Sequence, residues 1–342
     1  MSLIVLTSDR FADHLTPPGH PERAERAEAM QHVVSTWRRR GGAVEEPRPA
    51  TVAQLARIHD ADYISLIRET AGRAVALDPD TFTSPDSYEV ACLAAGAACQ
   101  GVDLVLDGDA TRAFAAVRPP GHHAERGRAM GFCLFNSVAV AAAHARARGL
   151  GRVAIVDYDV HHGNGTQWSF YDDPSVLLIS THQFPYYPGT GAASETGSGA
   201  GRGFTVNLPL DAGATDADYE RVYQRVVLPL LRGFAPELVL VSAGFDAHHR
   251  DPLAGMRLTA DGFGRLTALI AGAADEACGG RVVAVTEGGY DLHALATSLD
   301  TAIRVLAGES SLGDFAPPEG PTPRGNACLA EVELHAGQYW QL

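Results

Sequence analysis

One stretch, residues 153–167 with the sequence VAIVDYDVHHGNGTQ, constrains the fold of this chain more than any other. It opens with an apolar, largely β-branched run at 153–156, which has the length of a fully buried strand. The run then changes at once to acidic, imidazole and glycine residues. A buried strand that ends in charged groups predicts a functional site at its carboxyl end.

The polar residues that follow this strand have the spacing of a metal site. If extended geometry continues past the strand, Asp157, Asp159 and His161 share one face, while Tyr158 and Val160 point the other way. Carboxylate and imidazole ligands without thiolate suit catalytic zinc or a related divalent ion. A catalytic site takes three protein ligands, so two from this segment leave a third to be found elsewhere.

Short apolar runs alternate with longer helical segments along the chain. Strands are predicted at 2–6, 113–117, 153–156, 176–180, 204–208, 238–242 and 282–286, and helices at 21–40, 51–58, 60–71, 86–106, 136–148, 216–233, 259–278 and 292–308. This alternation predicts an α/β fold with a mostly parallel central sheet and helices on both faces. Residues 1–342 are expected to form a single domain, with the segment 309–342 wrapping over its surface.

The composition narrows the classes of partner. The net charge is −14, with 41 acidic and 27 basic residues, which disfavours nucleic acid and anionic membranes and mildly favours cationic ligands. The first ten residues lack the basic start and apolar core of a signal peptide, so we expect a cytoplasmic protein. Five scattered cysteines without a CxxC pair argue against a disulfide framework and against a thiolate zinc site.

Three other predicted strands also end in polar residues. Strand 113–117 leads to His122 and His123, strand 238–242 to Asp246, and strand 282–286 to Tyr290. Because the carboxyl ends of parallel strands meet at one edge of a sheet, we expect these side chains to converge. Asp246 is the best third metal ligand, since a preceding glycine lets the backbone turn into the site. The alternative is that it caps a helix.

The adjacent histidines are candidates for proton transfer, because an imidazole titrates near neutral pH. Taken alone, such a pair is more often found on a surface loop. Asp157 and Asn164 are possible partners for the second ring nitrogens, and one charged and one neutral partner would separate the two pKa values. Tyr290 could donate a hydrogen bond to a developing oxyanion, although a core tyrosine is the simpler interpretation.

Five segments, taken in order, resemble a known family. They are RPPGHH at 118–123, GFCLFNSVA at 131–139, VDYDVHHGNGTQ at 156–167, AGFDAH at 243–248 and EGGYD at 287–291. In order and spacing they resemble the zinc-dependent histone deacetylase superfamily, which includes bacterial acetylpolyamine amidohydrolases and acetoin-utilisation proteins. The resemblance covers about residues 1–305. Asn164 and the segment PGHPE at 18–22 are more similar to the class II branch than to class I, in which Asp stands at the position of Asn164.

This resemblance implies an arginase-like α/β fold and a role for each motif residue. It implies zinc, with ferrous iron as the alternative, bound by Asp159, His161 and Asp246. The implied catalytic residues are His123 as general base and acid, His122 as an electrostatic partner, Tyr290 as the group that polarises the scissile carbonyl, and Asp157 and Asn164 as the residues that orient His122 and His123.

The resemblance also implies a structural cation and a substrate tunnel. A potassium ion would be held by Asp157, by the backbone of Asp159 and His161, and by Ser180. The implied substrate-binding residues are Gly131, Phe132 and Tyr187 in the tunnel wall, Asp80 at the rim and Leu253 at a gatekeeper position. The implied reaction is hydrolysis of an acyl, principally acetyl, group from an acylated lysine side chain or a small acylated amine by metal-activated water.

Three alternative functions make different demands on the same residues. Ureohydrolases share the fold but need a second metal, and Gly163 stands where its bridging carboxylate belongs. A non-catalytic acyl-lysine binding protein would be expected to lose Tyr290 or a ligand, and none is lost. An acetylpolyamine amidohydrolase is favoured by the acidic charge and disfavoured by the apolar Leu253. Bacterial relatives can draw acidic groups from a neighbouring subunit, so a homo-oligomer is left open.

Overall fold

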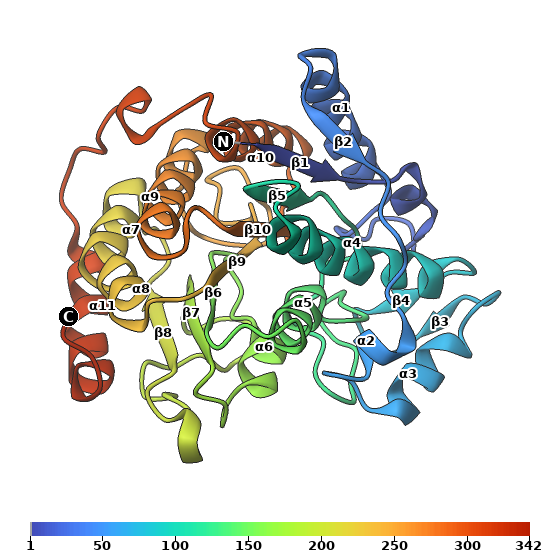
Figure 1. Cartoon of the computed structure of the whole chain (residues 1–342), viewed down its shortest axis with the longest axis horizontal. Helices are drawn as coiled ribbons and strands as arrows, with labels where there is room; N and C mark the ends of the chain where they lie inside the picture. The colour runs from blue at the N-terminus through green and yellow to red at the C-terminus, as the bar shows by residue number, and fades with distance from the viewer. Residues whose placement is uncertain (1) are drawn as a thin grey trace.

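A single parallel sheet forms the centre of the protein, for which the computed structural model describes residues 2–342 (Figure 1). Its eight strands within these residues are β1 (Leu3–Leu6), β2 (Ala43–Glu45), β5 (Arg112–Ala115), β6 (Val153–Asp157), β7 (Val176–Gln183), β8 (Thr205–Leu210), β9 (Leu238–Ala243) and β10 (Val282–Thr286). They lie in the order β2-β1-β5-β10-β9-β6-β7-β8, and each neighbouring pair is parallel. The two short strands β3 (Val75–Ala76) and β4 (Phe82–Thr83) form a separate antiparallel pair.

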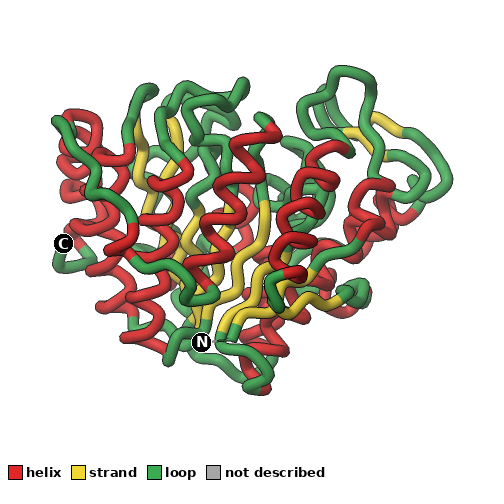
Figure 2. The backbone as a smooth tube through the Cα atoms, turned by 90° about the horizontal axis from the view of Figure 1, so that it is seen from above, coloured by secondary structure: helices red, strands yellow, loops and turns green. Residues whose placement is uncertain are grey.

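Helices cover both faces of this sheet because both faces of its strands are apolar. In β6, Val153 and Ile155 pack in one cluster with α4 (Ser87–Asp107) and α5 (Ser137–Ala147). Ala154 and Val156 pack in the other, with α1 (Glu25–Arg39), α9 (Ala260–Cys278) and α10 (Leu292–Leu306). Figure 2 shows the strands between the two helical layers, with loops gathered at the edge opposite the N-terminus. The predicted α/β fold is therefore confirmed.

Six further α-helices are found among residues 2–342. They are α2 (Val52–Leu55), α3 (Ala61–Arg68), α6 (Asn164–Ser169), α7 (Asp216–Val222), α8 (Leu228–Phe234) and α11 (Pro323–His335). A π-helical turn over Tyr223–Val227 joins α7 to α8, so the helix predicted at 216–233 is nearly continuous. In the C-terminal segment, Cys328 and Val332 of α11 are buried in the same core as α7 and β8. The indole Nε1 of Trp340 donates to the carbonyl of Gly203 at 2.6 Å.

Several element boundaries differ from the prediction by a few residues, and strands β2, β3 and β4 were not predicted. Two of the differences have a clear physical reason. The first helix begins at Glu25 instead of residue 21, because Glu22 is held in a buried ion network instead of a helical turn. Strand β7 continues to Gln183, three residues beyond the predicted end, because 181–183 pair with the end of β8. Tertiary pairing and burial set such boundaries, so the local sequence pattern does not predict them.

The buried ion network joins the N-terminal segment to the end of β5. Both carboxylate oxygens of Glu22 accept hydrogen bonds from Arg118, at 2.5 and 2.7 Å, and one also accepts from Arg26 at 2.9 Å. Burial opposes the charge of Glu22, but Arg118 outweighs burial and holds the pKa of the carboxyl well below its usual range. The network fixes the start of the loop that carries His122 and His123.

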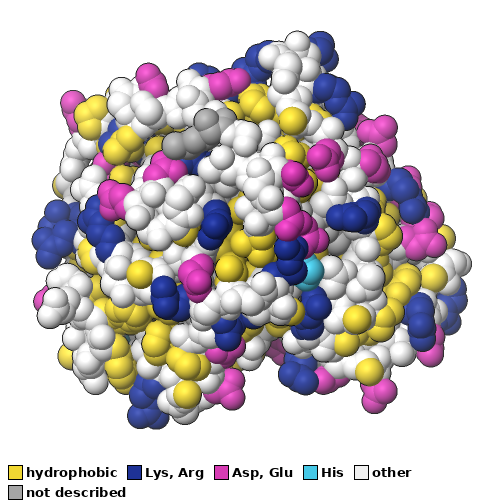
Figure 3. Space-filling model, in the orientation of Figure 1, with side chains coloured by type: hydrophobic (Ala, Val, Ile, Leu, Met, Phe, Trp, Pro, Cys, Tyr) yellow, Lys and Arg dark blue, Asp and Glu magenta, His cyan; other side chains and the backbone are white. Residues whose placement is uncertain are grey.

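Among residues 2–342, one helix, α4, is long and apolar enough to cross a membrane by length and composition. In this structure 78% of its most apolar window is buried inside the protein, where it packs against the sheet and α5. Its apolar character is therefore explained by its place in the core. On the face drawn in Figure 3, acidic and basic side chains are interspersed, in keeping with a surface that carries both signs of charge.

A buried histidine holds the loop between β5 and α5. The Nε2 atom of His59 accepts from the backbone of Asn136 at 2.9 Å, and its Nδ1 atom is 3.0 Å from the carbonyl of Glu125, to which it donates. The bond accepted at Nε2 requires the neutral imidazole, and burial lowers the pKa of His59 from 6.5 to about 4. The unfolded chain therefore takes up a proton between these two pH values that the folded protein does not.

We predict that acidification destabilises the protein through His59. Because the folded pKa lies below the unfolded one, stability is present above pH 6.5 and is lost as the pH falls towards 4. From pH 7 to pH 5 this histidine alone should lower the free energy of unfolding by about 2 kcal/mol. Urea denaturation at both pH values measures the difference. The difference in free energy of unfolding between the two pH values should be smaller in His59→Gln. It should be unchanged in His32→Gln, because the His32 imidazole is exposed in the wild type.

Candidate functional site

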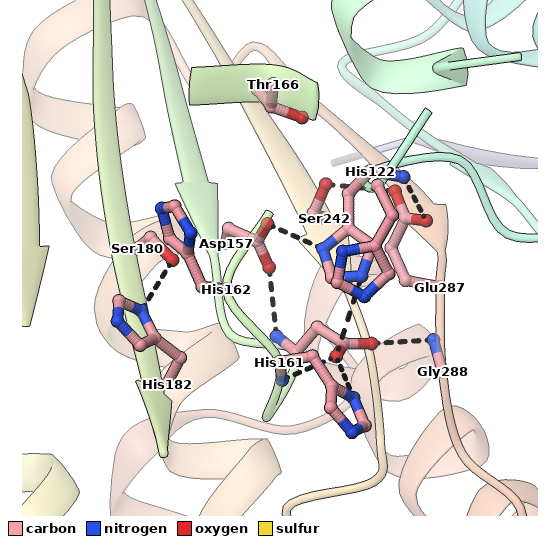
Figure 4. Close-up of polar contacts among 12 residues, drawn as sticks. His122, Asp157, His161, His162, Thr166, Ser180, His182, Ser242, Glu287 and Gly288 are labelled. Carbon is pink, nitrogen blue, oxygen red and sulfur yellow. Dashed lines mark hydrogen bonds and ion pairs between the residues drawn. The ribbon is translucent and has the colours of Figure 1, made fainter. Parts of the chain in front are cut away.

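Polar side chains that follow β5, β6, β9 and β10 meet at the carboxyl edge of the sheet. Figure 4 shows His122, Asp157, His161 and Glu287 turned toward one another from three of these segments. The convergence follows from the strand order, because β10 and β9 lie between β5 and β6. Tyr158 and Val160 point away into the core, as the alternation past the strand predicted.

Three of these residues place ligand atoms in one small volume. Asp159, His161 and Asp246 are buried, and one atom from each lies within 4.8 Å of the others. The Nδ1 atom of His161 is 3.2 Å from Asp159 Oδ1 and 3.1 Å from Asp246 Oδ2. The second oxygen of each carboxylate accepts a backbone hydrogen bond. Gly288 N donates to Asp159 Oδ2 at 2.7 Å, and Val160 N donates to Asp246 Oδ1 at 2.9 Å.

This donor set fits a divalent cation. Ligand atoms around a tetrahedral ion with bonds of 2.0–2.2 Å are about 3.3 Å apart, close to the separations around His161 Nδ1. Two buried carboxylates this close also need more positive charge than one ring N–H supplies. A side chain at Gly288 would fill the same volume, because its Cβ would lie 2.0 Å from Asp246 Oδ2. The predicted ligands are therefore brought together.

The first histidine of the pair lies among acidic groups. The Nδ1 atom of His122 is 3.0 Å from Asp157 Oδ2, and its Nε2 atom is 3.7 Å from Asp159 Oδ1. Burial disfavours the charged ring, but the carboxylates of Asp159 and Asp157 outweigh burial and raise the pKa of His122 to about 10. This imidazole is therefore charged at neutral pH.

The second histidine has the opposite character. The Nδ1 atom of His123 is 2.8 Å from the side-chain oxygen of Asn164, a neutral partner. Burial, followed by the neighbouring His122 and His161, holds the pKa of His123 well below its usual value. The ring is therefore neutral, and its Nδ1–H donates to Asn164, which leaves Nε2 free to accept a proton. The two partners separate the two pKa values in the way predicted.

Glu287 fastens the histidine loop to the sheet. Its Oε2 atom accepts from the backbone of Gly121 at 2.6 Å and of His122 at 3.1 Å, and its Oε1 atom accepts from Ser242 at 3.0 Å. Burial raises the pKa of this carboxyl to about 7. No role was predicted for Glu287, although an acidic residue directly after the apolar strand 282–286 is the same signal that identified Asp157.

Tyr290 is held from two sides. Its backbone N–H donates to Asp251 Oδ2 at 2.7 Å, and the guanidinium carbon of Arg26 lies 5.0 Å from the centre of its ring. Arg26 also donates to the carbonyls of Gly289 and Glu287, at 2.7 and 2.5 Å. Burial raises the pKa of the phenol well above its usual value, so the hydroxyl keeps its proton and acts as a donor.

Arg26 and Asp251 were missed by the sequence analysis. Arg26 falls on the buried stripe of α1 with Met30, Val33 and Trp37, and a charged residue on such a stripe was the available signal. Asp251 carries no comparable pattern. Its Oδ1 atom accepts from Leu253 N at 3.0 Å, which ties the rim of the site to Tyr290.

A narrow pocket leads from the surface to these groups. It has a volume of about 170 Å³, and its lining comprises the predicted residues Asp80, Gly131, Phe132, Tyr187 and Leu253, the site residues His123, His161 and Tyr290, and Tyr186, which was not predicted. The ring of Tyr187 packs edge-on against His123, with centroids 5.2 Å apart. The walls are aromatic, while the polar groups lie at the base.

Ser180 lies beside the site in the neighbouring strand. It pairs in register with Asp157, and its hydroxyl oxygen is 3.0 Å from Nδ1 of His182 (Figure 4). The structure thus places Ser180 next to Asp157, which is the arrangement that a shared cation would need. Whether potassium binds there stays a prediction.

Comparison with known protein families shows the family to which this chain belongs. A sequence model described as "Histone deacetylase domain" matches residues 20–306, which is most of the chain. The chain belongs to the histone deacetylase family. The family assignment predicted from the five motifs is confirmed, and with it the class of deacetylases and amidohydrolases.

Individual members of the histone deacetylase family agree with this assignment. Polyamine deacetylase HDAC10 from Homo sapiens is 41% identical over 334 residues, which cover 90% of this chain and 48% of that protein. A histone deacetylase-like amidohydrolase from Pseudomonas aeruginosa is 46% identical over 248 residues, or 71% of this chain and 64% of that protein. The crystal structure of the HDA15 HD domain superposes with a TM-score of 0.92 at 36% identity, covering 99% of this chain and 95% of that one.

We predict that the family site of this chain binds one divalent ion and that Asp246→Ala abolishes the binding. Zinc added to metal-free protein should stabilise it by about 2.7 kcal/mol at one hundred times its dissociation constant. The variant should show no such gain, because only two ligands remain. Thermal melts with and without zinc, together with metal analysis, measure both. Asp216→Ala, which removes a partly buried carboxylate bonded to Thr259, should keep the response.

Proposed function

We propose that this member of the histone deacetylase family hydrolyses a linear amide and removes an acetyl group from an acylated lysine side chain or a small acylated amine. One observation carries the proposal: the ligand set Asp159, His161 and Asp246 lies at the base of an aromatic pocket beside a neutral imidazole and a phenol. The pocket is narrow enough to favour an unbranched stem over a bulky group.

The roles of the residues follow from their positions. Zinc held by the three ligands would supply Lewis acidity toward an amide carbonyl and a water molecule. His123 is neutral with Nε2 free, so it takes a proton from the attacking water and returns it to the departing amine. Tyr290 donates a hydrogen bond to the carbonyl oxygen as negative charge develops on it.

His122 contributes a fixed positive charge. Because Asp157 and Asp159 keep it protonated, it does not compete with His123 for the proton that moves. Its charge lies close to the ligand carboxylate of Asp159, where it favours the negative charge that develops on the oxygens around the reacting carbon. A pair of histidines thus performs two tasks, and the partner of each ring decides which one.

The rim favours an acyl-lysine stem over a polyamine. Leu253, Phe132, Tyr186 and Tyr187 surround the stem with apolar and aromatic surface, and Asp80 is the acidic residue of the lining. A polyamine substrate carries a further ammonium group, which a rim with more carboxylates would bind more strongly.

Acetylpolyamine hydrolysis is the second candidate. The net charge of −14 and the likeness to polyamine deacetylase HDAC10 support it, since both point to a cationic substrate. We place it second because charge at a distance is screened by salt, whereas Leu253 is at the mouth.

A potassium ion shared by Asp157, Asp159, His161 and Ser180 completes the proposal. The adjacency of Asp157 and Ser180 in the β6–β7 register supports it. Such an ion would offset the acidic groups beneath the site. The melting temperature of the protein should then be higher in potassium chloride than in tetramethylammonium chloride at equal ionic strength.

We predict that Tyr290→Phe retains the metal and loses most turnover. Loss of a single oxyanion donor lowers kcat by about 10²–10³-fold. Steady-state kinetics and metal analysis of the same preparation measure the two quantities. The control is Tyr219→Phe, since the buried hydroxyl of Tyr219 has no hydrogen-bond partner among the described residues. Wild-type kcat in Tyr290→Phe would remove the phenol from the mechanism.

We predict that kcat/KM is about tenfold higher for an acetyl-lysine peptide than for N-acetylputrescine or N8-acetylspermidine, a difference of about 1.4 kcal/mol. Leu253→Glu should shift the ratio toward the polyamines, because it adds a carboxylate at the mouth. All 27 cationic positions of the chain are Arg, so any lysine side-chain amine that appears in the assay belongs to the substrate. A tenfold preference of the wild type for a polyamine would reverse the order, and no turnover at all would favour a binding protein.

A further inference from the structure

The amide of Asn164 has to be oriented for His123 to work. Its oxygen accepts from His123 Nδ1 at 2.8 Å, which keeps the proton on that nitrogen and leaves Nε2 free. An amide has an acceptor at one end and a donor at the other, and the two ends have nearly the same shape. If the group turned over, its NH₂ would face Nδ1 and favour the tautomer with the proton on Nε2. Some neighbour must select one orientation.

The neighbour is Glu125. The Nδ2 atom of Asn164 donates to Glu125 Oε1 at 2.7 Å. Its other contacts are weaker acceptors, the His123 carbonyl at 3.5 Å and the Met130 sulfur at 3.3 Å. A carboxylate has no proton to donate, so a turned amide would place oxygen against oxygen. The charge of Glu125 therefore selects the orientation that serves His123.

The backbone of Glu125 is itself fixed. Its N–H donates to the carbonyl of Arg128 at 2.9 Å, and its carbonyl accepts from His59 at 3.0 Å. The side chain is partly exposed, whereas Asn164 and His123 are buried. The acceptor is thus held at the boundary of the site by a rigid loop.

We propose that Glu125 is a positioning residue for the reaction, which locks the Asn164 amide and through it the tautomer of His123. The proposal rests on the proposed function for its kinetic consequences, but the tautomer is a property of the protein without substrate. Glu125 touches no reacting atom. Its effect reaches the pocket through two hydrogen bonds in series.

Substitutions at 125 and 164 test the lock as a pair. Glu125→Leu removes the acceptor and should lower kcat about tenfold at little change in KM, in the range found when a partner of an active-site histidine is lost. Glu125→Gln keeps an acceptor oxygen and should retain most activity. Asn164→Asp needs no orientation, yet places two carboxylates together and should lower kcat.

The decisive variant combines Asn164→Asp with Glu125→Gln. In the double variant the new glutamine amide donates to the new carboxylate. Glu125→Gln should therefore raise kcat when it is added to Asn164→Asp, although it does not raise kcat in the wild type. A merely structural role predicts equal effects in both backgrounds, within about twofold. Equal effects, or wild-type kcat in Glu125→Leu, would overturn the proposal.

A second readout does not depend on turnover. ¹⁵N-histidine spectra of the metal-free protein report which ring nitrogen of His123 carries the proton, with the signal identified by its loss in His123→Ala. The wild type and Glu125→Gln should show the Nδ1–H tautomer, and Glu125→Leu a mixture. An unchanged tautomer in Glu125→Leu refutes the lock even if no substrate is found. Asp60→Asn, which breaks an exposed ion pair with Arg126 in the same loop, should leave tautomer and kcat unchanged.

Discussion

The structure depends on burying four carboxylates, those of Asp157, Asp159, Asp246 and Glu287, within one end of the sheet. Each is costly unless its oxygens are bonded, and each is bonded to the backbone of another residue of the site. Asp246 holds Val160, Asp159 holds Gly288, and Glu287 holds Gly121. The acidic groups that form the candidate cation site therefore also connect the ends of the strands through hydrogen bonds.

The two adjacent histidines also depend on their hydrogen-bond partners. Two adjacent imidazoles with like partners would share one proton and neither would have a fixed task. Asp159 and Asp157 favour the charged form of His122, whereas burial favours the neutral form of His123, whose partner Asn164 is itself neutral. A neutral partner has a disadvantage that a carboxylate lacks, because an amide can face either way. The additional carboxylate of Glu125 compensates for this, so the choice of Asn at 164 extends the network by one residue.

Much of the site could be predicted because it lies where apolar runs stop. The polar residues after 153–156, 238–242 and 282–286 needed only the rule that parallel strands end at one edge. The roles of Arg26 and Asp251 were not predicted, because each reaches the site through hydrogen bonds with backbone atoms that are distant in the sequence. The six residues of α6 are too few for a helical period, and its first residue, Asn164, was assigned by chemistry alone. Strand β2 is three residues long and mostly exposed, so it has no apolar signature.

The position of β10 has a consequence for how the molecule is made. The last strand in the sequence lies between β5 and β9, at the centre of the sheet. Until it leaves the ribosome, β5 and β9 lack the strand that lies between them, and α1 lacks the helix it packs against. Long-range pairing of this kind slows folding and exposes the chain to aggregation. Synthesis of the final strand thus closes the sheet and brings Tyr290 to the metal ligands in one step.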